Sequence, residues 1–208
     1  PALVYISQPT EYGTLYSLRE LEELSAVCRE RDLKLFADGA RLAYALASPA
    51  NDVTLADLAR LTDVFYIGGT KCGSLFGEAV VIPERGSIRQ FVTHMKQHGA
   101  LMAKGRLLGV QFEALFEDGL YLTIGEPAVE ATARIREALK RAGYVVTMDS
   151  PTNLTFVALD QAGHERLSDK VRYGIWETLP DGRYLARIGT SWATPEEDVV
   201  AFEEALAR

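Results

Sequence analysis

Two apolar runs with helical stretches between them constrain the fold of this chain more than any other feature. Residues Leu33 to Ala37 and Val64 to Ile67 have the length and apolar content of buried strands. The residues between them predict two short helices, one from about Ala40 and one from about Thr54 to Leu61. This βαβ order predicts two parallel strands joined by a right-handed crossover, and with it an α/β fold.

Polar residues follow each of these two strands. Asp38-Gly-Ala-Arg41 comes directly after the first, and Gly68-Gly-Thr-Lys-Cys-Gly73, which contains Lys71, follows the second. Parallel strands of one crossover end at the same edge of the sheet, so we expect Asp38 and Lys71 to meet there. A carboxylate can keep a pyridine nitrogen protonated, and a lysine can bond to an aldehyde. The pair therefore suggests a pyridoxal phosphate site.

Each of these residues also has an ordinary interpretation, which the sequence leaves open. Lys71 alone fits an exposed lysine in a turn, Asp38-Gly39 is a common turn pair, and Arg41 fits a surface ion pair. The Lys71 loop is not a P-loop, which requires Gly-Lys before Ser or Thr. His94 and His98 have helical spacing but lack the glutamate of a zinc protease, so we expect no metal site.

The rest of the chain predicts two parts of different character. Residues 3–7 predict a strand, and Ser17-Leu-Arg-Glu20 is a capping box that begins a helix. Its buried face is expected to carry Leu18, Leu21, Leu24 and Val27. From Tyr144 onward, short strands alternate with a helix or two. We expect residues 1–126 to belong to a large domain and residues 127–208 to form a small C-terminal α+β domain.

Composition narrows the class of function. The net charge of -7 and the pI near 5.1, with scattered basic residues, give no basic stripe, so we expect no nucleic-acid or membrane partner. No apolar run approaches the length of a membrane span. The two cysteines, Cys28 and Cys72, form no CxxC pair, which favours reduced thiols and a cytoplasmic location.

Three motifs in order along the chain resemble one known family. They are Asp38-Gly-Ala-Arg-Leu42, Thr70-Lys71 in its glycine turn, and Ala186-Arg-Ile-Gly-Thr-Ser-Trp-Ala-Thr-Pro-Glu-Glu-Asp198. Together they resemble the threonine aldolase branch of the fold-type I pyridoxal phosphate-dependent enzymes, the β-eliminating lyase group. The resemblance implies a partial large domain with a parallel or mixed sheet, followed by a small α+β domain.

The resemblance also implies a role for each matching residue. Lys71 would bond to the aldehyde of pyridoxal phosphate, and Asp38 would pair with its pyridine nitrogen. Arg41 would lie by the phenolic oxygen of the cofactor, with Ala40 near the ring and Thr70 also among the binding residues. Arg187 matches the arginine that binds the substrate carboxylate, a task suited to a planar bidentate donor; a domain-interface salt bridge is the alternative for it.

The chain departs from the family pattern in three places. The family's phosphate-binding turn and ring-stacking histidine have no counterpart before Leu3, and the chain opens on Pro1, so we expect a missing N-terminal segment. Gln8-Pro-Thr10 replaces a family histidine, which leaves the general base unassigned. Met102 stands where some members carry an arginine.

The resemblance implies an aldolase that cleaves a β-hydroxy-α-amino acid, threonine or allo-threonine, to glycine and an aldehyde. Two alternatives stay open: another fold-type I activity, such as β-elimination or transamination, and a non-catalytic truncated module of the same fold. The family also implies homo-oligomerisation, as a dimer or tetramer.

Overall fold

The structure, a computed structural model, describes residues 2–207 and divides into two compact units. The first consists of the chain up to Gln8, Tyr16–Ala43 and Asp52–Thr123. The second consists of Pro9–Leu15, Tyr44–Asn51 and the chain from Ile124. The domain boundary at residue 126 stays a prediction. No helix within residues 2–207 is both long enough and apolar enough to cross a membrane.

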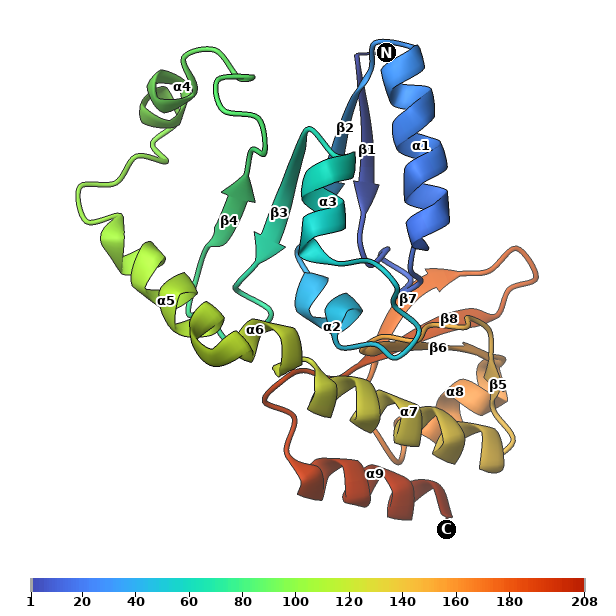
Figure 1. The fold of residues 1–208 in the computed structure, drawn as a ribbon. Coiled ribbons are helices and arrows are strands. Elements are labelled where there is room, and N and C mark those ends of the chain that lie inside the picture. The colour runs from blue at the N-terminus through green and yellow to red at the C-terminus, as the bar shows by residue number, and fades with distance from the viewer. Residues whose placement is uncertain (1, 208) are drawn as a thin grey trace. The chain divides into compact units, whose positions relative to one another are not determined.

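The first unit is built on a four-stranded sheet in the order β1-β2-β3-β4 (Figure 1). Its strands are β1 (Leu3–Ser7), β2 (Lys34–Asp38), β3 (Val64–Gly68) and β4 (Glu78–Val81). β1, β2 and β3 are parallel, which confirms the βαβ prediction, whereas β4 runs antiparallel to β3. The connection between β3 and β4 is therefore a hairpin loop, and this loop carries Lys71.

Two capped helices, α1 (Leu18–Glu30) and α3 (Leu55–Leu61), pack side by side against the sheet (Figure 1). The predicted capping box at Ser17 is present, and Thr54 forms a second one with Asp57. The sequence predicted that Val27 lies on the buried face of α1 together with leucines. This prediction is wrong for Val27, whose side chain is 49% exposed. The buried residues of the helix are Leu21, Ser25 and Cys28. Ser25 can lie there because its hydroxyl donates to the Leu61 carbonyl at 2.7 Å.

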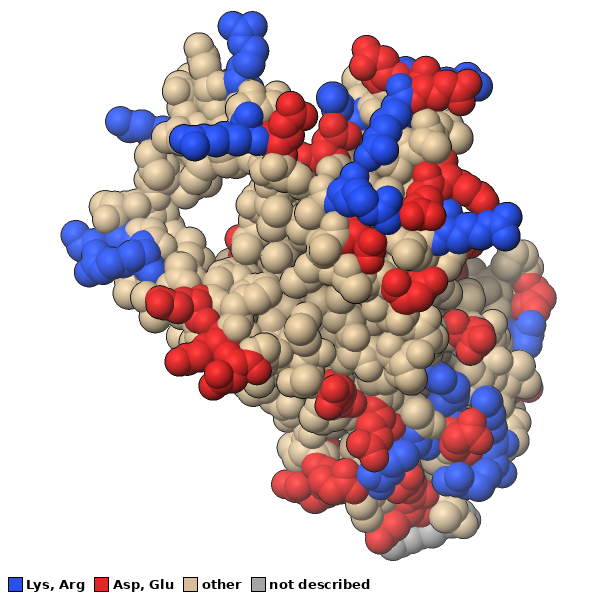
Figure 2. Space-filling view, viewed as in Figure 1, with Lys and Arg blue, Asp and Glu red and all other residues tan. Residues whose placement is uncertain are grey.

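Acidic and basic side chains alternate over the outer surface of α1 and α3 (Figure 2). Arg60 of α3 pairs with Glu22 of α1 at 2.9 Å and with Asp57 at 3.1 Å. Arg29 of α1 donates to the Arg60 carbonyl at 2.8 Å. These exposed pairs contribute little to stability individually, but they fix the helices in register with each other.

The two faces of the sheet differ in their side chains because residues alternate along a strand. The face beneath the helices is buried, and it is lined by Ile6, Leu35, Ala37, Phe65 and Ile67. On the other face Tyr5 stacks on Phe36 with ring centroids 5.2 Å apart, and Phe36 meets Tyr66 edge to face at 4.9 Å. Asp38 lies two positions after Phe36, so it belongs to this second face at the carboxyl end of β2.

Helices complete the first unit after β4. They are α4 (Phe91–Gln97), α5 (Arg106–Phe116), the 3-10 turn η1 (Glu117–Gly119) and α6 (Leu120–Thr123). The sequence pattern predicted helices from about Ser87 to His98 and from about Lys104 to Phe116, and α4 and α5 lie within these stretches. α6 was not predicted. The division between the units runs through α2 (Leu42–Leu46).

The second unit packs helices against an antiparallel sheet in the order β5-β6-β8-β7. Its elements are α7 (Glu126–Arg141), β5 (Val145–Val146), β6 (Leu154–Leu159), α8 (Gln161–Ser168), β7 (Gly174–Thr178), β8 (Tyr184–Gly189) and α9 (Glu196–Ala207). Arg134 of α7 joins two residues of α9, Glu196 at 2.6 Å and Glu203 at 2.7 Å. β7 was not predicted, because its residues lack the alternation of apolar and polar side chains that marks a strand.

We expect Phe156→Ala to lower the free energy of unfolding by about 3 to 5 kcal/mol, since the fully buried ring leaves a cavity. Urea unfolding followed by tryptophan fluorescence measures the change, because the centre of the Trp176 ring lies 6.2 Å from that of the Phe156 ring. Val145→Ala, at a position 57% exposed in the same sheet, is the control and should change the free energy by less than about 0.5 kcal/mol. Equal losses in the two variants would contradict this account of the core.

Candidate active site

The carboxylate of Asp38 is held by two hydrogen bonds at the end of β2. One oxygen accepts the backbone N–H of Ala40 at 2.9 Å, and the other accepts the hydroxyl of Tyr5 from β1. The chain then turns sharply, and the Asp38 carbonyl accepts the N–H of Gln8 at 2.8 Å. These contacts orient a half-buried carboxylate that keeps part of its surface open.

Lys71 lies in the tight loop that connects β3 with β4. The Gly69 carbonyl accepts the N–H of Cys72 at 2.9 Å and that of Ser74 at 3.1 Å, so the chain turns back on itself around the lysine. Lys71 is exposed, whereas its neighbour Cys72 is fully buried. Cys72 therefore anchors the loop in the interior, and the preceding residue, Lys71, lies at the surface.

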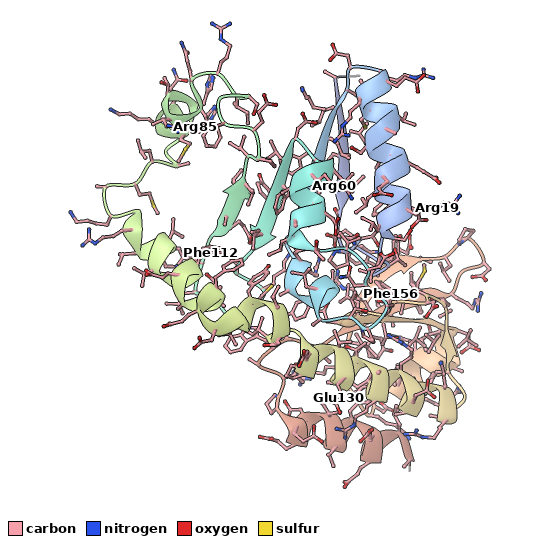
Figure 3. The ribbon with its side chains drawn as sticks, viewed as in Figure 1. Arg19, Arg60, Arg85, Phe112, Glu130 and Phe156 are labelled. Atoms are coloured by element: carbon pink, nitrogen blue, oxygen red, sulfur yellow. The ribbon has the colours of Figure 1, made fainter. Side chains whose placement is uncertain are left out.

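Residues of α5 and α6 contact the start of this loop. Tyr121 of α6 is fully buried and donates its hydroxyl to the Gly68 carbonyl at 2.8 Å. Phe112 of α5 projects toward the loop, where its ring end lies 2.8 Å from the place that a Cβ on Gly69 would occupy (Figure 3). A side chain at position 69 therefore does not fit.

Glycines bring the Asp38 loop and the Lys71 loop into direct contact. The N–H of Gly68 donates to the Gly39 carbonyl at 2.9 Å. A Cβ on Gly68 would collide with the carbonyl oxygens of Gly39 and Ala40, and one on Gly39 would collide with the Tyr66 carbonyl. The two loops that the sequence predicted at one sheet edge thus lie side by side.

The other predicted residues of the first unit lie on the same two loops. Ala40 and Arg41 follow Asp38 and are partly buried. Thr70 precedes Lys71, is exposed, and donates its hydroxyl to the Gly77 carbonyl at 3.3 Å across the loop. Their assignment to a cofactor stays a prediction.

Arg187 lies in β8 of the second unit. Its guanidinium carbon is 4.3 Å from the centre of the Trp176 ring in the neighbouring β7, a cation–π contact that holds the planar group in place. Among residues 2–207 no ion pair of Arg187 is found. A stacked guanidinium of this kind keeps its donors available for a carboxylate ligand.

Three titratable side chains beside the Lys71 loop were not predicted from the sequence. Burial raises the pKa of the Cys72 thiol to about 11, and it also raises the pKa of the Tyr121 hydroxyl. Both groups therefore stay neutral at physiological pH. Desolvation also raises the pKa of Glu78 at the start of β4, against the opposing effects of a Gly69 hydrogen bond and the Lys71 charge. Glu78 carried no motif, and only the strand register shows that it faces Gly68.

Comparison with solved structures identifies the class of this fold. A Thermus thermophilus aspartate aminotransferase mutant in complex with tryptophan superposes with a TM-score of 0.70 at 16% identity, over 99% of this chain and 56% of that one. The Leishmania major threonine aldolase superposes with a TM-score of 0.94 at 46% identity, over 100% of this chain and 61% of that one. The fold is that of the fold-type I pyridoxal phosphate-dependent enzymes.

The family follows from the sequence itself. Residues 1–162 match the family model described as beta-eliminating lyase, and the chain belongs to that family. It is also 39% identical over 204 residues to a low specificity L-threonine aldolase of a Pseudomonas species, strain NCIMB 10558. That match covers 96% of this chain but 57% of the relative, so the chain spans little more than half the length of the curated protein.

We expect Gly68→Ala to separate the two loops and to lower the free energy of unfolding by about 1 to 3 kcal/mol, because the added methyl group collides with two backbone oxygens. Gly109→Ala is the matched control: it lies in α5 with open space around its Cβ position, so alanine should raise helix stability by about 0.5 to 1 kcal/mol. Thermal and urea unfolding measure both changes. A neutral Gly68→Ala would contradict the tight approach of the loops.

Proposed function

We propose that this protein cleaves β-hydroxy-α-amino acids, threonine or allo-threonine, to glycine and an aldehyde with pyridoxal phosphate as its cofactor. The observation that carries the proposal is the contact between the Asp38 loop and the Lys71 loop, made through Gly68 and Gly39. The similarity of this chain to two threonine aldolases, at 46% and 39% identity, supports the same reaction class.

The donor set of the first unit fits this cofactor. The exposed amine of Lys71 and the oriented carboxylate of Asp38 lie on adjoining loops. The residues at which these loops meet are glycines, which place no side chain between them. Lys71 would hold the cofactor through its aldehyde, and Asp38 would hold a proton at the pyridine nitrogen. Ala40, Arg41 and Thr70, on the same loops, would line the ring and its phenolic oxygen. When bound, pyridoxal phosphate supplies an electron sink for cleavage of the bond between Cα and Cβ.

Arg187 would bind and orient the substrate carboxylate. A planar guanidinium matches a carboxylate with two parallel hydrogen bonds, and the Trp176 ring already restricts the plane in which Arg187 lies. Orientation of this kind decides which bond at Cα is cleaved, and well-oriented groups can supply about 7 kcal/mol or more of a barrier.

We also propose that the protein works in the cytoplasm as a homo-oligomer, a dimer or tetramer. Both cysteines are free and buried, as expected of a protein in a reducing compartment. The first unit exposes Leu75, Phe76, Leu107 and Val110, and Gln111 hydrogen-bonds to the backbone of three of these residues. Contiguous apolar surface of this kind supports association with a second copy.

The alternative activities of the same fold are β-elimination and transamination. Each would use the same lysine and aspartate, so the site residues alone do not separate them. Product analysis does so, because only the aldolase releases glycine and an aldehyde from a β-hydroxy-α-amino acid. A protein that binds the cofactor yet yields neither product would favour one of these alternatives.

We expect pyridoxal phosphate added to the purified protein to give an absorbance band between ~410 and 430 nm, as a cofactor bonded to lysine does. Lys71→Ala should abolish the band and the release of glycine. Lys96→Ala, an exposed lysine in α4, is the control and should retain both. The same band in Lys71→Ala would overturn the assignment, and no band in any variant would favour the non-catalytic module.

We expect Arg187→Ala to raise the KM for threonine about tenfold or more, because a hydrogen-bonded charge contact worth at least ~1.4 kcal/mol is lost. The KM of Arg187→Lys should lie between those of the parent protein and Arg187→Ala, because lysine keeps the charge but lacks the planar guanidinium. Arg183→Ala is the control, because Arg183 is bound to Asp181 in the exposed turn of the same hairpin. Steady-state kinetics with threonine measures all three, and an unchanged KM in Arg187→Ala would exclude the proposed contact.

A further inference from the structure

Glu78 is the acidic residue that the strand register brings to the Lys71 loop. It is the first residue of β4, and it pairs with Gly68, the last residue of β3. The Lys71 loop runs from one of these residues to the other. The side chain of Glu78 therefore lies at the point where the loop begins and ends.

The carboxylate of Glu78 accepts a backbone donor at the start of the loop. One oxygen accepts the N–H of Gly69 at 2.9 Å. Gly69 lies two residues before Lys71. Hydrogen bonds from backbone N–H groups to an ionised carboxylate are about twice as strong as neutral ones, so this contact is a specific restraint on the loop.

Charges of the site act on Glu78. Desolvation raises the pKa of Glu78, the positive charge of Lys71 opposes this rise, and the charge of Asp38 adds to it. Cys72 and Tyr121, the other titratable groups packed against the loop, are neutral because burial raises the pKa of each.

We propose that Glu78 is the positioning residue for Lys71: its carboxylate fixes the backbone just before the lysine. The role of Lys71 as the working amine rests on the function proposed above. The contact between Glu78 and the loop does not, so it can be tested without cofactor or substrate.

Cys72 provides a direct measure of loop position, because it is buried and directly follows Lys71. The chain has two cysteines, so a Cys28→Ala background leaves Cys72 as the single thiol. In that background, Glu78→Ala should raise the rate of Cys72 modification by the disulfide reagent DTNB about tenfold or more, since a charge-assisted restraint is lost. Glu78→Gln, which keeps an acceptor oxygen, should raise the rate no more than about threefold.

Glu78→Gln separates the hydrogen bond from the bulk of the side chain, because glutamine keeps an acceptor oxygen at the same reach. Glu84→Ala, at an exposed glutamate after β4 in the same unit, is the matched control and should leave the rate of Cys72 modification unchanged.

The results separate this inference from the proposed function. Unchanged Cys72 modification in Glu78→Ala would overturn the positioning role even if pyridoxal phosphate bonds to Lys71. The expected rise in a protein that does not take up pyridoxal phosphate at Lys71 would support the contact and refute the proposed function. If Glu78→Ala does not fold, Glu78→Asp, too short to reach the loop, tests the restraint.

Discussion

The contact between Gly68 and Gly39 is the constraint on which the candidate site depends. A single backbone hydrogen bond of 2.9 Å joins the two loops, and the surrounding carbonyl oxygens leave no room for a Cβ at either position. Glycine is the residue that permits so close an approach of two backbones. Because Asp38 and Lys71 belong to these loops, the contact sets how closely their backbones approach each other.

The direction of β4 adds a third charged group to the same edge. A parallel β4 would need a crossover and would begin at the opposite edge of the sheet. Since β4 is antiparallel, its first residue, Glu78, returns to the end of β3 and to the loop that contains Lys71. The hairpin therefore determines both the tight loop around the lysine and the carboxylate that restrains it.

Sequence patterns predicted those parts of the site that are encoded locally. The βαβ order and the polar residues after each strand sufficed to place Asp38 and Lys71 on neighbouring loops, because parallel topology converts chain order into proximity. Tyr5 and Glu78 were missed since they reach the site through strand register, which the sequence does not display. Similarly, Ser25 is buried because of its bond to Leu61, so an apolar pattern alone could not find it.

The two carboxylates at this edge are held differently, and this difference argues for different tasks. Asp38 accepts hydrogen bonds from the Tyr5 hydroxyl and the Ala40 N–H, while part of it stays open to a ligand. Glu78 instead bonds to the backbone of the Lys71 loop, and desolvation raises its pKa. Neighbouring carboxyl groups with unlike environments generally serve unlike roles. Asp38 is thus suited to face a bound ring, and Glu78 to hold the lysine that faces it.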